Sequence, residues 1–250
     1  MSRRHVRFAG VRRRTAAVLL AAAMLAGCGD DGPRWGLPDP ASSEGESIRD
    51  LWQGFFLTAL GVVALVWGLL AYVFIRYRRR NDDVPRQNPF NIPLEITYTV
   101  VPLLVVAGLF AFSQIAQDDL TRSESDATVR VDVVAFQWQW RFTYPDEAVS
   151  LVGTPERGAP ELVLPVGETV RFDLRADDVA HSFWVPDFFE KRDLIPGVDN
   201  EMDITPTRTG TFVGRCAEFC GLQHWAMGFT VRVVERDDYD EWLAGEADRG

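Results

Sequence analysis

Side chains that cross-link a chain or bind soft metals are scarce in this sequence. Its 250 residues include only three cysteines, three histidines and four methionines. Three cysteines are too few for a disulfide scaffold. Internal repeats and low-complexity stretches are absent from the sequence, and aromatic residues make up 12% of it. This composition argues against an intrinsically disordered protein.

Charge is unevenly distributed along the chain. Residues 1–117 hold 13 Lys and Arg against 9 Asp and Glu, a net charge of +4, whereas residues 118–250 hold 13 against 27, a net charge of −14. The overall charge of −10 therefore describes neither half. A strongly acidic half repels phosphate groups, so no nucleic-acid partner is expected.

The N-terminus has the pattern of a bacterial export signal. Arginines gather in the first 14 residues, and the apolar run Ala16 to Ala26 follows. This run is shorter than the about 20 residues that cross a bilayer. It ends in Leu25-Ala-Gly-Cys28, which resembles a lipoprotein cleavage site. We expect residues 1–27 to be a signal peptide and Cys28 to carry lipid; an ordinary signal with an incidental Cys28 is the alternative.

Two uncharged runs, 51–75 and 96–117, are each long enough to be a transmembrane helix. The loop between them, residues 76–95, contains five arginines, which places it in the cytoplasm. Residues 28–50 are rich in Gly, Pro, Asp, Ser and Glu and predict a flexible outer tether. The chain after residue 117 is therefore expected outside the bacterial plasma membrane.

Residues 118–250 have the pattern of an all-β domain. Apolar and polar residues alternate at 129–133, at 170–174 and at 231–233, as in strands with one buried face. Turn sequences such as Tyr144-Pro-Asp and Ile195-Pro-Gly separate such segments. Several short strands over about 110 residues predict a β-sandwich or barrel.

Soft donor side chains are concentrated in one short segment. Cys216, Cys220, His224 and Met227 lie within twelve residues, and His181 lies 35 residues before Cys216. Thiolate and imidazole donors suit copper, and a weak Met ligand is typical of electron-transfer copper sites. An electron-transfer site with one copper ion needs only one thiolate ligand. The second cysteine would also be a ligand if both thiolates bridged a pair of copper ions.

Three alternatives to copper compete for the two cysteines. A Cys216–Cys220 disulfide is possible in an oxidising compartment. Zinc with two cysteines and two histidines usually has both histidines after both cysteines, whereas His181 comes first. Haem attachment requires Cys-x-x-Cys-His, which the spacing here does not match.

The segment Cys216-x-Glu218-x-Cys220-x3-His224-x2-Met227 resembles subunit II of haem–copper cytochrome c oxidases. The resemblance extends over nearly all of the mature chain, through Asp178-Val-Ala-His181, Gln137-Trp138-Gln-Trp140 and Leu94-Glu95-Ile-Thr-Tyr. It implies a two-helix transmembrane hairpin, followed at 118–250 by a cupredoxin-like β-barrel.

The resemblance also implies a binuclear copper centre of the type called CuA. The resemblance implies that Cys216 and Cys220 bridge the two copper ions and that His181 and His224 bind one copper each. It implies Met227 and the Glu218 carbonyl as weak ligands. The side chain of Glu218 would help to hold a magnesium ion against subunit I.

Two residues outside the copper segment gain roles from the resemblance. Trp138 matches the residue that receives electrons from cytochrome c; ordinary aromatic packing is the alternative. Glu95 matches a residue at the mouth of a proton channel into subunit I. Its alternative is a carboxylate that merely stabilises the positive end of a helix.

The function implied is that of an electron-relay subunit. It would pass electrons from cytochrome c to haem in subunit I, where oxygen reduction is coupled to proton pumping, with subunit III as a further neighbour. A quinol-oxidase subunit would lack Cys216 and Cys220, and a nitrous oxide reductase needs a large histidine-rich domain. A copper-delivery lipoprotein, with an exchangeable site, is the remaining alternative.

Overall fold

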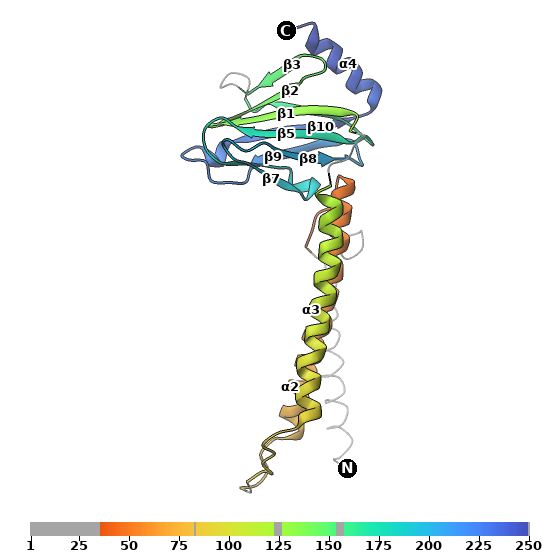
Figure 1. The fold of residues 1–250 in the computed structure, drawn as a ribbon, viewed down its shortest axis with the longest axis vertical. Coiled ribbons are helices and arrows are strands. Elements are labelled where there is room, and N and C mark those ends of the chain that lie inside the picture. Colours follow the sequence, from red (N-terminus) through yellow and green to blue (C-terminus); the bar gives the residue numbers. More distant parts are fainter. Residues whose placement is uncertain (1–35, 83, 123–126, 154–157, 250) are drawn as a thin grey trace, which may run out of the picture. The chain divides into compact units, whose positions relative to one another are not determined.

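The computed structural model describes residues 36–82, 84–122, 127–153 and 158–249. The expected signal peptide and Cys28 lie outside these residues. The described elements are two long helices, ten strands, two short 3-10 helices and a C-terminal helix (Figure 1).

Helix α2 spans Ser43–Arg76 and helix α3 spans Ile92–Leu120. Both are long and apolar enough to cross a membrane. The helices have 34 and 29 residues. At a rise of about 1.5 Å per residue, each helix is longer than the thickness of a bilayer's hydrocarbon core, which is about 30 Å. The helices pack against each other, and Gly54 of α2 faces Phe112 of α3.

Helix α2 begins before the expected transmembrane run. Residues 43–50, expected to belong to a flexible tether, form its first two turns. Ser42 caps the helix by accepting a hydrogen bond from the Gly45 N–H, and Glu44 and Glu46 lie in the first turn, where negative charge is favourable. These local features outweigh a composition that by itself indicates a loop.

The ten strands form two five-stranded sheets (Figure 1). One has the order β3-β2-β1-β5-β8 and the other β4-β10-β9-β6-β7. The strands are β1 Val129–Phe136, β2 Gln139–Tyr144, β3 Val149–Val152, β4 Glu161–Pro165, β5 Val170–Ala176, β6 His181–Trp184, β7 Lys191–Leu194, β8 Asn200–Ile204, β9 Gly210–Cys216 and β10 Gly228–Val234. Among these described strands, β1 pairs in parallel with β5 and β4 with β10, and the remaining pairs are antiparallel.

The strands predicted from alternation are confirmed as parts of β1, β5 and β10, whose alternate residues are buried. Helix α4, Arg236–Ala247, follows β10. A transmembrane-type helix pair joined to a cupredoxin-like β-domain is therefore the fold, as the sequence predicted.

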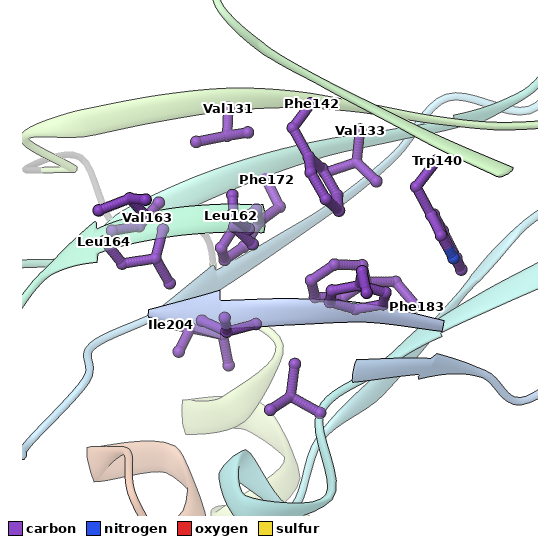
Figure 2. Close-up of a cluster of buried hydrophobic side chains, with 14 of the residues drawn as sticks. Val131, Val133, Trp140, Phe142, Leu162, Val163, Leu164, Phe172, Phe183 and Ile204 are labelled. Carbon is purple, nitrogen blue, oxygen red and sulfur yellow. The ribbon is translucent and has the colours of Figure 1, made fainter. Parts of the chain in front are cut away.

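Aromatic and aliphatic side chains together fill the space between the two sheets (Figure 2). Trp140 and Phe142 point from β2 toward Phe183 of the other sheet, and Phe183 stacks on Phe229 with ring centroids 4.8 Å apart. A side chain at Gly214 would overlap the Phe229 ring, so this position needs glycine. This core lies directly beneath the loop that carries the cysteines, since the Trp140 indole N–H reaches the Met227 carbonyl.

Candidate metal centre

The candidate ligands come from two neighbouring strands and one loop. His181 is the first residue of β6, and Cys216 is the last residue of β9, which pairs with β6. The loop from β9 to β10 carries Cys220 and the short helix η2, His224–Ala226. The Cys216 N–H donates to the Met227 carbonyl at 3.0 Å and closes this loop.

The donor atoms converge on the two sulfurs. The Sγ atoms of Cys216 and Cys220 lie 3.8 Å apart. Each has one imidazole beside it: His181 Nδ1 is 3.8 Å from Cys216 Sγ, and His224 Nδ1 is 3.6 Å from Cys220 Sγ. The Met227 sulfur lies 3.7 Å from Cys220 Sγ, and the Glu218 carbonyl oxygen lies 3.2 Å from Cys216 Sγ.

The two cysteines are free thiols. Their separation of 3.8 Å is far beyond the about 2.05 Å of a disulfide bond. The structure therefore contradicts the disulfide alternative and leaves both sulfurs available as ligands.

Electrostatics opposes the ionisation of both thiols together. Burial disfavours the Cys216 thiolate, but hydrogen bonds from His181 and from the Ser182 backbone outweigh this and lower its pKa. Burial and the neighbouring Cys216 charge raise the pKa of Cys220. Because like charges at this distance repel, the second thiolate requires a cation between the sulfurs, which is the role of a thiolate-bound metal.

Asp178 orients the His181 ring. Its Oδ1 lies 2.9 Å from His181 Nε2, so His181 Nδ1 is left to face Cys216. Burial raises the pKa of Asp178, but hydrogen bonds from His181 and from the Gln137 and Val179 N–H groups outweigh this and lower it. Carboxylates that hold the second nitrogen of a ligand histidine are typical of metal sites.

Trp138 touches the cysteine loop directly. Its indole N–H donates to the Cys220 carbonyl at 3.1 Å, and the Gln137 side-chain amide donates to the same oxygen at 2.7 Å. Gly221 has φ +119°, and a Cβ there would lie 3.0 Å from the Gln137 nitrogen. The loop therefore needs glycine here, and Trp138 is held by contacts beyond ordinary aromatic packing.

The surface beside the cysteines is strongly apolar. Phe219, Leu222 and Trp225 are 76%, 83% and 86% exposed, and Glu218 is an exposed residue of the same loop. This apolar patch is not predictable from the sequence, because residue spacing alone does not show which loop residues face solvent. The hydrogen bond from the Gln137 side chain to the Cys220 carbonyl is not predictable either. Exposed apolar clusters of this kind are typical of binding surfaces.

Among the described residues with a predicted role, Glu95 is the one that lies apart from the cluster. It is in the first turn of α3, where its Oε1 accepts a hydrogen bond from the Asn91 N–H at 2.9 Å. Asn91 in turn caps the helix through the Leu94 N–H. The structure thus gives Glu95 a helix-capping contact.

The fold and the site define a membrane-anchored redox protein with a cupredoxin-like domain and a His/Cys/Cys/Met cluster consistent with a copper site. Residues 157–234 match the family described as cytochrome c oxidase subunit II, periplasmic domain, and residues 33–114 match its transmembrane domain.

Relatives are similar over most of the chain. Probable cytochrome c oxidase subunit 2 of Streptomyces avermitilis is 39% identical, over 96% of this chain and 89% of the relative. Cytochrome c oxidase subunit 2 of Mycobacterium bovis is 32% identical, over 85% and 75%. The crystal structure of the periplasmic domain of subunit II of cytochrome oxidase from Bradyrhizobium japonicum is 31% identical, over 49% of this chain and 96% of that one, with a TM-score of 0.45.

The chain belongs to the cytochrome c oxidase subunit II family. It is the electron-transfer subunit of a haem–copper oxidase, a membrane protein with two transmembrane helices and a periplasmic domain.

Replacing Asp178 tests its orienting role. We expect Asp178→Ala to weaken copper binding by about 10- to 100-fold, because His181 loses the partner that fixes its ring. The measurement is copper retention against a chelator series. Asp177→Ala, at the adjacent carboxylate, serves as the matched control and should retain copper normally. Equal retention by the two variants would contradict the role.

Proposed function

We propose that this subunit accepts single electrons from cytochrome c and passes them to haem in subunit I. Oxygen reduction and proton pumping belong to the assembled oxidase. The observation that carries the proposal is the pair of thiols 3.8 Å apart with no disulfide between them, and an imidazole nitrogen within 3.8 Å of each. This symmetric donor set fits two metal ions better than one.

The residues fit a binuclear CuA centre. Cys216 and Cys220 would bridge the two coppers, and His181 and His224 would bind one each. Met227 and the Glu218 carbonyl would be weak ligands, as their sulfur and oxygen each lie beside one of the two thiols. When bound, such a pair supplies a one-electron couple whose charge is shared over both ions.

The hydrogen bonds of the protein hold the candidate copper ligands rigidly in place. The loop is closed by the bond between Cys216 and Met227, His181 is fixed by Asp178, and the Cys220 carbonyl accepts two side-chain donors. Ligands that hardly move between oxidation states favour fast electron transfer. A buried, closed site also argues against copper delivery, which needs ligands that exchange readily.

Spectroscopy of the copper-loaded protein tests the binuclear centre. We expect two coppers per chain, near-infrared absorption, and a paramagnetic signal shared over both ions. Cys220→Ser should abolish the shared signal because one bridge is lost, whereas Phe219→Ala, an exposed side chain in the same loop, should preserve it. A wild-type signal confined to one copper, or a site that retains zinc but not copper, would refute the proposal.

The surface around the site supports docking of two partners. The −14 charge of residues 118–250 suits a donor with a basic face, which speeds association through electrostatic steering. The apolar patch of Phe219, Leu222 and Trp225 supports packing against another oxidase subunit. We propose that subunit I covers it, with a magnesium ion held partly by the Glu218 carboxylate; subunit III remains an expected neighbour.

We propose Trp138 as the residue through which electrons arrive, because its indole bonds to the carbonyl of a bridging cysteine. Trp138→Phe removes this N–H and should slow reduction by cytochrome c severalfold or more while the copper spectrum stays unchanged. Trp242→Phe is the matched control, since Trp242 is also half-buried but packs on Tyr144. Unchanged reduction of the Trp138 variant would refute the role.

Glu95 is proposed as the start of a proton path into subunit I, in addition to its capping contact. Glu95→Gln keeps an oxygen acceptor for the Asn91 N–H but cannot release a proton. We expect oxidase turnover to fall about tenfold or more, measured as oxygen consumption by the assembled enzyme. Asn91→Ala removes the cap alone and should leave turnover near normal; equal effects of both changes would indicate a structural role.

We also propose that Cys28 carries a lipid anchor and that the arginine-rich loop lies in the cytoplasm. Both rest on the sequence pattern. The mass of the mature chain tests the first, because lipidation adds acyl groups to a chain that begins at Cys28. Cysteine labelling from each side of the membrane, with a cysteine introduced into residues 76–91, tests the second.

A further inference from the structure

The segment just before helix α2 is bound to the β-domain. We call residues 40–45 the helix latch. Ala41 and Ser42 are fully buried, and Ser42 forms a β-bridge with Pro206. The Thr207 N–H donates to the Ala41 carbonyl at 2.9 Å, and the Ser43 N–H donates to the Thr205 carbonyl at 3.0 Å. The latch therefore binds the connection between β8 and β9 through one β-bridge and two backbone hydrogen bonds.

One hydroxyl joins the helix to the domain. Ser42 Oγ accepts from the Gly45 N–H at 3.0 Å, which caps α2, and donates to the Phe188 carbonyl at 3.1 Å. Phe188 ends the short helix η1, Pro186–Phe188. Both bonds are buried. The first turn of a membrane helix is thus bonded directly to the β-domain.

Gly45 makes this close approach possible. A Cβ at this position would lie 2.9 Å from the Phe188 carbonyl oxygen and 3.0 Å from the Pro40 Cβ. Any larger residue would push α2 away from η1. Glu44 adds a further link, because its Oε2 accepts from the Thr205 N–H at 3.1 Å.

The latch connects to the metal centre through a single strand. Helix η1 follows β6 after one residue, and the first residue of β6 is His181. Strand β6 pairs with β9, which ends at Cys216. A shift of η1 against α2 would therefore move a strand pair that carries two candidate ligands, relative to the membrane helices.

We propose that the helix latch sets the position of the copper centre relative to the membrane, and that Ser42 and Gly45 are positioning residues for electron release to subunit I. This inference rests on the proposed function. The haem-bearing partner is fixed in the membrane, so release depends on where the centre is held. Electron uptake depends instead on a mobile donor, which can follow a displaced domain.

The test uses the assembled oxidase with Ser42→Ala and, separately, Gly45→Ala. Ser42→Ala removes both hydroxyl bonds, and Gly45→Ala forces the helix away. The matched control is Thr58→Ala, which also removes a hydroxyl bond of α2, but one that stays within the helix, from Thr58 to the Gly54 carbonyl. Rapid-mixing absorption follows copper reduction by cytochrome c and then haem reduction as two separate steps.

We expect the two latch variants to keep the copper spectrum, the rate of copper reduction and the KM for cytochrome c. Haem reduction and kcat should fall severalfold, since the rate of electron transfer between two fixed centres decreases steeply as the distance between them grows. Thr58→Ala should match the wild type in every measurement.

Three outcomes would overturn the inference. Haem reduction at the wild-type rate in both variants would show that the latch does not control release. An altered copper spectrum would show that it supports the site itself, and failure of both variants to assemble would show a role in assembly. Failure of the proposed function is distinguishable, because it appears as a missing binuclear copper signal in the wild type.

Discussion

The structure depends on one electrostatic constraint: two buried thiols are held 3.8 Å apart without a disulfide bond between them. Burial disfavours both thiolates, but hydrogen bonds lower the pKa of Cys216, and the Cys216 charge adds to burial in raising the pKa of Cys220. Two thiolates at this distance repel, and a cation between them resolves the repulsion. The surrounding imidazoles, thioether and carbonyl are the soft and weak donors that direct this site toward copper.

Holding two repelling groups together requires a stiff support. The β9–β10 loop is closed by a backbone bond at its base, and its Met227 carbonyl accepts a hydrogen bond from Trp140, which packs on Phe183 and Phe229. Asp178 then links His181 to the backbone of Gln137, next to the tryptophan proposed for electron uptake. A single carboxylate thus couples the orientation of one ligand to the position of the donor-facing turn.

The sequence predicted the parts of this arrangement that are local. Ligand spacing from Cys216 to Met227 survives folding because all four side chains belong to one loop and its base, and the strands at 129–133 and 170–174 follow from period-two burial. Long-range contacts were not predictable. Residues 41–45 have the composition of a loop, yet Ala41 and Ser42 are buried by residues more than 140 positions away. The donation of two hydrogen bonds to the Cys220 carbonyl, from Gln137 and Trp138, likewise depends on the tertiary fold.

Electron uptake and electron release rest on different parts of the same domain. In the proposed function, the turn between β1 and β2 presents Trp138 to a soluble donor, and steering by the acidic surface would tolerate small displacements because the donor diffuses. A partner fixed in the bilayer cannot adjust in this way. A domain that takes part in both electron uptake and electron release must have a rigid metal site and must also be attached rigidly to its membrane helix. The buried Ser42 hydroxyl provides the rigid attachment, because it caps α2 and also bonds to η1. The flexible connection suggested by composition would keep the copper ligands intact and still leave the distance to haem undefined.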